Sequence, residues 1–135
     1  MYRISKSFTF AAAHKLVHPY IGKCSTVHGH TYTVDVVLVG DSLDSCGMLV
    51  DFNNFAPLKR YIDIMLDHSL LNDTIEQPTC EHIAKHLFEF CAASWAGVES
   101  VRVWESAKAW AEYSDPVLTH DKTARARLQH SKRAQ

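Results

Sequence analysis

Two segments in which apolar and polar residues alternate constrain the fold of this chain more than any other feature. In residues 3–14, one parity is largely apolar, while Ser5, Ser7 and Thr9 occupy the other. Residues 28–39 alternate in the same way and are rich in Val, Thr and Tyr, which favour strands. Because successive strand side chains point to opposite faces, each segment predicts a strand with one face against a core. The predicted inward residues are Ile4, Phe8, Phe10, Ala12, His14, His28, His30, Tyr32, Val34, Val36 and Leu38.

Two helices are predicted after these strands. Residues 54–66 carry an apolar stripe at steps of three and four, and Pro57 falls in the first turn, where its missing N–H has no helical partner. That stripe consists of Phe55, Leu58, Ile62 and Met65. The second helix is expected to begin at Thr79 as N-cap, with Glu81 in its first turn. Its stripe consists of Cys80, Ile83, Ala84, Leu87, Phe88 and Cys91.

The predicted order of elements is β-β-α-α-β-β, because residues 99–105 and 109–113 read as two short strands. A chain of 135 residues favours one domain, and we assign residues 1–115 to a single α+β domain. An antiparallel sheet with both helices on one face leaves two open edges. Closing several copies into a ring would remove those edges, so we expect a homo-oligomer.

The last segment, residues 116–135, lacks a clear pattern and is treated as a basic C-terminal tail. Its cations are Lys122, Arg125, Arg127, Lys132 and Arg133. Two interpretations stay open, a solvated and flexible terminus or a basic arm that contacts phosphates.

Composition excludes several classes of protein. A net charge of −1 argues against a strongly basic nucleic-acid binder, so no nucleic-acid partner is expected. The apolar runs are far shorter than the roughly 18 residues of a membrane span, and the first residues resemble no secretory signal. The four cysteines form no Cys-x-x-Cys pair, so we expect reduced thiols and a cytoplasmic location.

The histidines provide the sharpest local signal. His28 and His30 flank Gly29 on a predicted strand, so both imidazoles project from one face. Catalytic zinc typically takes three protein ligands and keeps a fourth position open. His14 ends the first strand on the same face, where an antiparallel neighbour would bring it beside the other two. The alternative is a chance His-x-His pair.

A second histidine pair, His82 and His86, also has metal-capable spacing. Both residues lie opposite the apolar stripe of the second helix, together with Lys85 and Glu89. We therefore predict a solvated helix face for this pair.

Ordered motifs along the chain resemble the 6-pyruvoyltetrahydropterin synthase / 6-carboxytetrahydropterin synthase family. They occur at residues 10–14 (FAAAH), 24–30 (CSTVHGH), 47–52 (GMLVDF), 66–68 (LDH), 71–73 (LND), 78–81 (PTCE) and 104–105 (WE). Three residues separate Cys24 from His28, a gap that resembles the 6-carboxytetrahydropterin synthase branch of queuosine-type 7-deazaguanine biosynthesis. The resemblance implies the tunnelling fold (T-fold), in which subunits join into a barrel, stack into a hexamer and form active sites at their interfaces.

The resemblance also implies a reaction. A zinc enzyme would convert 7,8-dihydroneopterin triphosphate to 6-carboxy-5,6,7,8-tetrahydropterin, acetaldehyde and triphosphate. His14, His28 and His30 would bind Zn2+, in agreement with the spacing argument. Three rival functions stay open: a pyruvoyl-forming synthase, a non-catalytic zinc-stabilised pterin-binding module, and a Cys/His hydrolase that uses Cys24 and His68.

The family pattern gives Cys24 the role of proton acceptor. From the residues alone, Cys24 could instead be a structural loop cysteine or a fourth zinc ligand that closes the site. Asp67 and His68 would form a proton relay, for which the alternative is an ion pair at a helix end. Ser69 follows His68, where the carboxy branch often has a second histidine.

The remaining site residues implied by the resemblance bind the pterin. Glu105 ends the third strand, and its carboxylate could accept two adjacent N–H groups of the pterin edge. The alternative for Glu105 is an exposed residue at a strand end. Thr79 and Phe52 are expected to help seat the ring.

Overall fold

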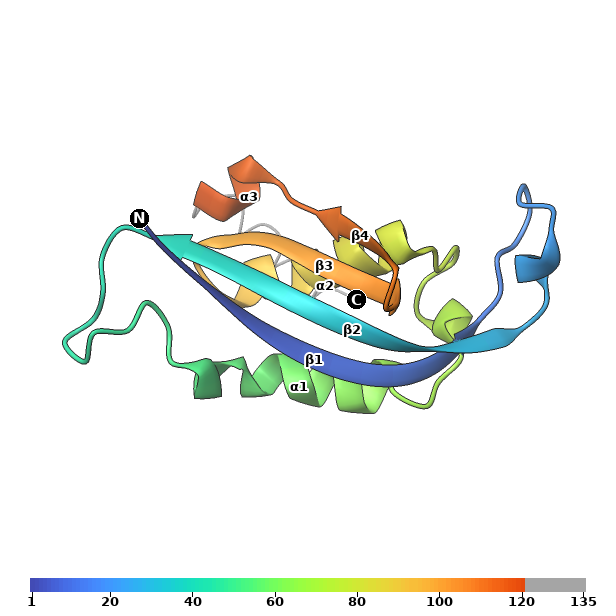
Figure 1. Cartoon of the computed structure of the whole chain (residues 1–135), viewed down its shortest axis with the longest axis horizontal. Coiled ribbons are helices and arrows are strands. Elements are labelled where there is room, and N and C mark those ends of the chain that lie inside the picture. Colours follow the sequence, from blue (N-terminus) through green and yellow to red (C-terminus); the bar gives the residue numbers. More distant parts are fainter. Residues whose placement is uncertain (121–135) are drawn as a thin grey trace.

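The fold is a four-stranded antiparallel sheet with helices packed on one face (Figure 1). It is seen in a computed structural model that describes residues 1–120. The strands follow one another in the order β1 (Tyr2–His14), β2 (His28–Gly40), β3 (Val98–Ser106) and β4 (Ala109–Tyr113). All four predicted strands are confirmed.

The helical elements fill the long connection between β2 and β3. They are η2 (Phe52–Phe55), α1 (Ala56–Tyr61), η3 (Ile62–Leu66), η4 (Leu71–Asp73) and α2 (Cys80–Ser94); η1 (Lys23–Ser25) lies earlier and α3 (Pro116–His120) later. Side chains of α1 and α2 share one hydrophobic core with β1, β2 and β3, which confirms the predicted layer arrangement. Among the described residues, the longest helix has 15 residues, and none combines the length and hydropathy needed to cross a bilayer.

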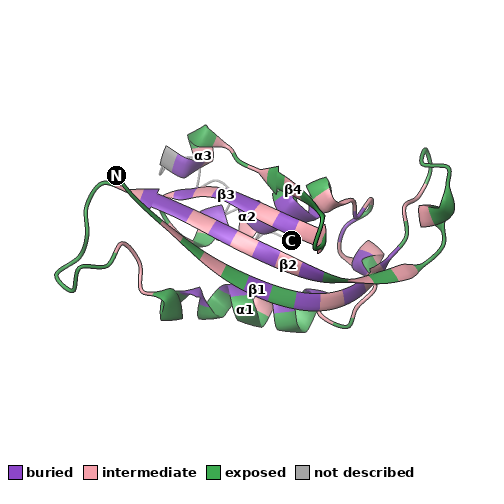
Figure 2. Cartoon of the chain, viewed as in Figure 1, coloured by how far each residue is buried: buried purple, intermediate pink, exposed green. Residues whose placement is uncertain are grey.

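The two long strands β1 and β2 determine the shape of the molecule. They pair along their whole length, from Tyr2 opposite Gly40 to His14 opposite His28. Most inward positions are buried, with Ile4, His28 and His30 half-buried, and the outward positions other than Val39 are more exposed, as the alternating colours of Figure 2 show. The predicted inward parity is therefore confirmed for both strands. The loop of residues 15–27 lies at one end of this pair, and residues 41–51 lie at the other end (Figure 1).

The predicted stripe of the first helix is wrong at one position. Met65 is 44% exposed, whereas Leu66 is fully buried in the core. Residues Ile62–Leu66 form a π-helix, and the amide of Asp67 donates to the carbonyl of Ile62, five residues earlier, at 2.8 Å. Because a π turn is wider than an α turn, the residue four positions after Ile62 returns to the core side.

The second helix begins as predicted. The Thr79 hydroxyl accepts a hydrogen bond from the His82 amide at 3.2 Å, so Thr79 is the N-cap. The predicted stripe packs inward, with Cys80 half-buried and the other five residues fully buried. This N-terminus lies next to the ends of β1 and β3, which positions Thr79 and Cys80 near the candidate site.

A short helix, α3, occupies the start of the expected tail. The Thr119 hydroxyl is buried and donates to the carbonyl of Val98 in β3 at 2.6 Å. Leu118 packs against the hydrophobic core. The packed structure thus continues to residue 120, and the basic segment 121–135 lies outside the described residues.

The π turn generates a stability prediction. Leu66→Ala removes a fully buried side chain and should lower the free energy of unfolding by about 2–5 kcal/mol. The matched change Met65→Ala, at an exposed position, should cost less than about 1 kcal/mol. Urea denaturation of the two variants measures this difference. Equal losses would show that the turn is not wound as described.

Candidate metal centre and pocket

Three histidine side chains meet at one end of the sheet. His14 is the last residue of β1 and pairs with His28, the first residue of β2, while His30 lies two positions further along β2 on the same face. One ring nitrogen from each lies within 4.8 Å of the other two. The predicted cluster is therefore formed by the register of a single strand pair.

Hydrogen bonds to two carbonyls fix the orientation of two of these rings. His14 Nδ1 lies 2.7 Å from the carbonyl oxygen of Pro78, and His28 Nδ1 lies 2.7 Å from that of Thr26. A carbonyl only accepts, so each Nδ1 must carry the proton and each Nε2 must present a lone pair when the ring is neutral. The two Nε2 atoms are 3.1 Å apart. Two facing lone pairs need a cation or a proton between them.

His30 adds the third nitrogen. Its Nε2 is buried and has no hydrogen-bond partner among residues 1–120. Burial lowers the pKa of His30; the neighbouring His14 and His28 add to this effect, and Glu105 opposes it. A neutral imidazole with a free, buried nitrogen is the form that binds a metal.

The donor set fits zinc. Three imidazole nitrogens and an open side match the ligand set of catalytic zinc sites. Metal-binding histidines usually donate their second N–H to a carbonyl or carboxylate, which is the arrangement of His14 and His28. His14, His28 and His30 could therefore hold a zinc ion through their Nε2 atoms.

A pocket of about 170 Å³ adjoins the cluster. It is lined by His14, Leu16, Cys24, Thr79, Cys80, Glu81 and Glu105. These residues come from β1, η1, the N-terminus of α2 and the end of β3. Three predicted site residues, Cys24, Thr79 and Glu105, thus lie around one cavity beside the histidines.

Cys24 is held in the pocket by the loop that follows β1. Its carbonyl accepts a hydrogen bond from the Leu16 amide at 2.8 Å, and its side chain is half-buried. A hydrogen bond with the Cys24 side chain raises the pKa of Tyr20. The Tyr20 ring also covers Gly22, where an added Cβ would lie 2.6 Å from the Tyr20 hydroxyl oxygen. The loop therefore places a half-buried thiol in the wall of the pocket.

Cys80 is a pocket residue that we assigned to the structural stripe of α2. Its thiol donates to the Val103 carbonyl at 2.9 Å, and burial raises its pKa to about 11. It therefore stays a neutral thiol near pH 7 and is unsuited to accept a proton. Its first-turn position in α2 was the available signal that it could face a site.

Glu105 connects the pocket to the metal cluster. One of its carboxylate oxygens lies 3.4 Å from His30 Nε2. The side chain is partly exposed toward the cavity, at 33%. A carboxylate in this position can accept hydrogen bonds from a ligand that occupies the pocket.

Asp67 and His68 form a pair at the outer edge of β1. Asp67 accepts from the Ala11 amide at 2.9 Å and lies 2.9 Å from His68 Nδ1. The Ala11 hydrogen bond, followed by the His68 contact, lowers the pKa of Asp67. The His68 amide donates back to the Ala11 carbonyl at 2.6 Å, and its φ of 55° lies in the left-handed region, which is unusual for a residue other than glycine. The backbone thus holds His68 firmly while its side chain is 83% exposed.

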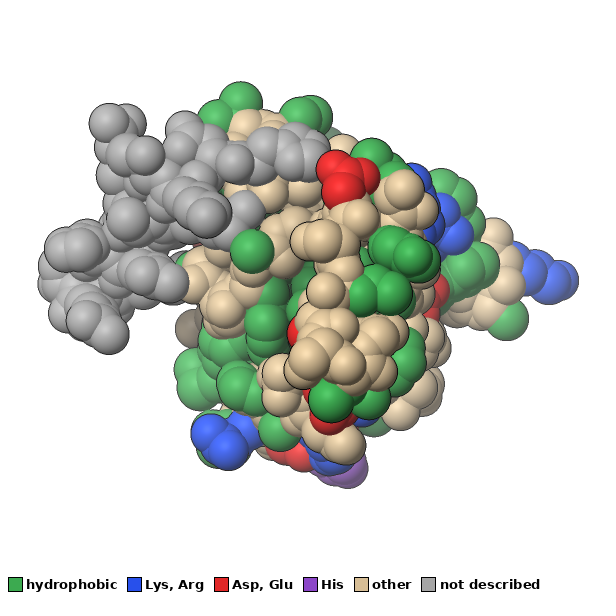
Figure 3. Space-filling view, turned by 90° about the vertical axis from the view of Figure 1, so that its left-hand side faces the viewer, with side chains coloured by type: hydrophobic (Ala, Val, Ile, Leu, Met, Phe, Trp, Pro, Cys, Tyr) green, Lys and Arg blue, Asp and Glu red, His purple; other side chains and the backbone are tan. Residues whose placement is uncertain are grey.

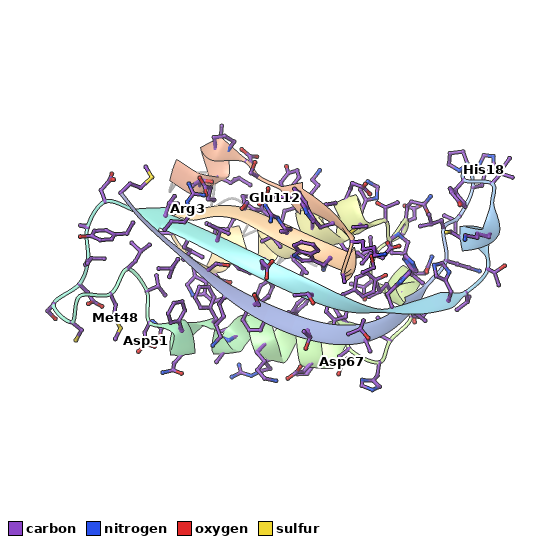
Figure 4. All side chains as sticks on the ribbon, viewed as in Figure 1. Arg3, His18, Met48, Asp51, Asp67 and Glu112 are labelled. Carbon is purple, nitrogen blue, oxygen red and sulfur yellow. The ribbon has the colours of Figure 1, made fainter. Side chains whose placement is uncertain are left out.

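This pair does not join the pocket within one chain. Figure 4 shows Asp67 beside the end of β1, on the side of α1. His68 instead lines a shallow hollow of about 770 Å³, which it shares with His30 of the cluster but not with Cys24, Thr79 or Glu105. Cys24 and His68 therefore line different cavities of a single chain.

Phe52 lies at the opposite end of the sheet. It begins η2, is 49% exposed, and lines a separate pocket of about 310 Å³ with Met48 and Asp51. Figure 4 shows Met48 and Asp51 far from Asp67, and Figure 3 shows hydrophobic side chains gathered on this end of the molecule. One chain therefore does not bring Phe52 to the metal cluster.

The second histidine pair has two different environments. His82 is exposed, as predicted, and its Nδ1 lies 2.8 Å from the Gln77 carbonyl. The prediction is wrong for His86, which is half-buried and contacts the Tyr61 hydroxyl. Tyr61 reaches α2 from α1, a contact between elements that helix spacing does not reveal.

Comparisons with known proteins identify the family. The sequence model of 6-pyruvoyl tetrahydropterin synthase matches residues 3–116. The chain belongs to the 6-pyruvoyl tetrahydropterin synthase family. The matched range includes all the histidines of the cluster and every residue of the adjoining pocket.

Several relatives of this chain are named 6-carboxy-5,6,7,8-tetrahydropterin synthase. The chain is 38% identical to 6-carboxy-5,6,7,8-tetrahydropterin synthase of Synechocystis sp. over 130 residues, which span 88% of this chain and 98% of the relative. It is also 38% identical to the Bacillus subtilis protein of that name over 96 residues, which span 65% of this chain and 64% of the relative.

Solved structures show the same fold. The 6-pyruvoyl tetrahydropterin synthase of Caenorhabditis elegans superposes with a TM-score of 0.75 at 23% identity, covering 84% of this chain and 95% of that one. The 6-pyruvoyl tetrahydropterin synthase of Plasmodium falciparum superposes with a TM-score of 0.68 at 15% identity, covering 84% of this chain and 97% of that one. The predicted T-fold architecture of the subunit is confirmed.

The geometry of the cluster predicts the metal content of variants. His14→Ala, His28→Ala and His30→Ala should each weaken zinc binding by more than about 100-fold, because loss of an outer partner alone costs about 10–100-fold. His82→Ala is the matched control and should bind zinc normally, since His82 lies outside the cluster. Competition with a chelating dye measures the affinities. Normal zinc affinity in His30→Ala would contradict the three-nitrogen site.

Proposed function

We propose that this protein is a zinc-dependent 6-carboxytetrahydropterin synthase. It would convert 7,8-dihydroneopterin triphosphate to 6-carboxy-5,6,7,8-tetrahydropterin, acetaldehyde and triphosphate, as a step of 7-deazaguanine biosynthesis. The observation that carries this proposal is the convergence of three imidazole nitrogens beside a pocket that contains Cys24 and Glu105. The two relatives at 38% identity, named for this activity, support the choice of product.

Zinc bound at this cluster would supply Lewis acidity. A zinc ion held by His14, His28 and His30 would acidify and orient the hydroxyls of the substrate side chain. Neutral histidines leave the charge of such an ion undiminished, unlike carboxylate or thiolate ligands. The rest of the chemistry falls to side chains around the pocket.

Glu105 and Thr79 suit recognition of the pterin ring. Pterins present an N–H and an amino group on one edge, and one carboxylate can accept from both in a bidentate pair. The Thr79 oxygen already accepts from the His82 amide, so its hydroxyl proton is available to a ligand. These two residues would hold the ring while the side chain extends toward the histidines.

Cys24 is the proposed proton acceptor. It is one of two thiols that line the pocket, and the other, Cys80, is excluded as a base because its pKa is raised to about 11. Cys24 can therefore remove a proton from the carbon side chain of a substrate seated on Glu105.

A second copy of the chain would complete the site. The Asp67–His68 pair presents an oriented imidazole at the edge of β1, separate from the pocket of its own chain. An oriented carboxylate–imidazole pair suits proton transfer near neutral pH. We propose that subunits join along the open sheet edges, in a hexamer, so that His68 of one copy faces Cys24 of another. Phe52 would approach the pterin from a neighbouring copy in the same way.

The nearest rival is the pyruvoyl-forming reaction, which eliminates triphosphate and retains the two-carbon unit. The family name and the solved structures fit either reaction. The three-residue gap between Cys24 and His28 favours the carboxy branch. Acetaldehyde is released in the carboxy-forming reaction and not in the pyruvoyl-forming reaction, so its detection distinguishes the two.

Product analysis tests the proposed activity. Zinc-loaded protein incubated with 7,8-dihydroneopterin triphosphate should release acetaldehyde and triphosphate, and a chelator should abolish turnover. Cys24→Ala should lose at least about 100-fold in kcat, within the range for a general base, while retaining zinc. Cys46→Ala, at an exposed position outside the pocket, is the control with normal turnover. A product that retains all side-chain carbons would select the pyruvoyl reaction instead.

Mixing two inactive variants tests the shared site. Cys24→Ala and His68→Ala each damage a different half of the proposed site. Subunits exchanged at equal ratio should recover about one quarter of wild-type activity, because random assembly restores one intact pairing in four. Unmixed variants are the control. Failure to recover activity in mixed oligomers, verified by mass spectrometry, would place both groups in one chain.

A further inference from the structure

The Tyr32 hydroxyl is a buried polar group that the site described above does not use. Tyr32 lies on β2, two residues after His30 and on the same face. Its side chain is fully buried, and its hydroxyl oxygen has no hydrogen-bond partner among residues 1–120. Most buried polar groups in folded proteins are hydrogen-bonded, so an isolated hydroxyl calls for an explanation.

Packing explains the ring of Tyr32 but not its hydroxyl. The ring stacks on Phe10 with centroids 4.9 Å apart and an interplanar angle of 17°. It also meets the rings of His14 and His30 edge-on, at 6.0 Å and 5.5 Å. A phenylalanine would make the same ring contacts without burying an unpaired donor. The hydroxyl therefore has no structural use in the ligand-free chain.

The register of β2 and β3 places Tyr32 across from Glu105. Thr33 pairs with Trp104 and Val34 with Val103, so Tyr32 and Glu105 are the next neighbours on the inner face. Glu105 and Cys80 are the groups that act electrostatically on the Tyr32 hydroxyl. Cys80 already donates its proton to the Val103 carbonyl, whereas the Glu105 carboxylate can accept several hydrogen bonds.

The present contact of Glu105 competes with a metal ion. Its carboxylate oxygen lies 3.4 Å from His30 Nε2, the nitrogen that a metal would take. A metal bound to that nitrogen would end this ion-pair contact, and the Glu105 carboxylate could then accept a hydrogen bond from another donor. The Tyr32 hydroxyl is a buried donor on the same inner face, without a partner in the part of the chain that the structure describes.

We propose that Tyr32 is a positioning residue, whose hydroxyl donates to the Glu105 carboxylate in the metal-loaded protein and orients it toward the pterin. This inference rests on the proposed function through the role of Glu105. The hydrogen bond leaves the carboxylate's remaining lone pairs free to accept from the ligand edge. Tyr32 thus acts on the ligand through Glu105 and does not touch the reacting atoms.

Binding measurements on Tyr32→Phe test the proposal. Zinc-loaded protein in the Cys24→Ala background is titrated with 7,8-dihydroneopterin, followed by fluorescence. Tyr32→Phe should weaken binding by about tenfold, the effect of one hydrogen bond to a charged group, and should leave zinc content unchanged. In a Glu105→Ala background the same change should have no further effect. An equal weakening in both backgrounds would overturn the proposal, because the hydroxyl would then act on the ligand directly.

Thermal unfolding of the metal-free protein separates this role from a structural one. Tyr32→Phe should keep or raise the Tm, because it removes an unpaired buried hydroxyl. The matched control is Tyr61→Phe, whose hydroxyl contacts His86. That variant should lower the Tm and leave pterin binding unchanged. A marked fall in Tm for Tyr32→Phe would show that the hydroxyl has a partner in the free protein and would overturn the proposal.

A crystal structure of the zinc-loaded, ligand-free protein tests the hydrogen bond independently of any pterin. The expected distance between Tyr32 Oη and a Glu105 carboxylate oxygen is about 2.5–3.0 Å. A hydroxyl bonded to another group, or left beyond hydrogen-bonding reach, would overturn the proposal. If the bond is present and no variant binds 7,8-dihydroneopterin, the proposed function fails while the Tyr32–Glu105 contact stands.

Discussion

The pairing of His14 with His28 across β1 and β2 is the contact on which the rest of the site depends. If β1 shifted by one residue relative to β2, the imidazole on one of the two strands would point to the opposite face of the sheet. The continuous ladder from Tyr2 to His14 and the buried inward side chains hold the register. Carbonyls of Pro78 and Thr26 then set the tautomers, so that the nitrogens left free point at each other. The pairing of β1 with β2 thereby creates a site that can hold a cation.

Elements that are distant in sequence build the pocket around this pairing. The N-cap at Thr79 fixes the start of α2, and the preceding Pro78 carbonyl holds the His14 ring. The start of α2 therefore orients one histidine of the cluster and lines the pocket. On the opposite side of β1, the amide and carbonyl of Ala11 bind Asp67 and His68. One strand thus presents a histidine of the metal-capable cluster on its inner face and binds the Asp67–His68 pair at its outer edge.

Local patterns were sufficient to predict much of this arrangement. Alternation along residues 3–14 and 28–39 identified the inward face, and with it the convergence of the three histidines. Helix periodicity failed at Met65 because the chain changes to a π turn there, a choice made by tertiary packing. The pocket position of Cys80 and the His86–Tyr61 contact depend on elements far apart in the chain. The same holds for the neighbouring positions of Tyr32 and Glu105 on the inner face, which follow from the register of β2 and β3. The separation of Asp67 and His68 from Cys24 likewise follows from the fold, since their motifs carry no information on distance.

X-ray absorption at the zinc edge of the metal-loaded protein tests the central claim most directly. The account predicts three nitrogen ligands at about 2.0–2.1 Å, with the remaining position held by oxygen and the Cys24 sulfur outside the coordination shell. A sulfur ligand at about 2.3 Å would contradict it, because Cys24 would then close the site and could not serve as the proton acceptor.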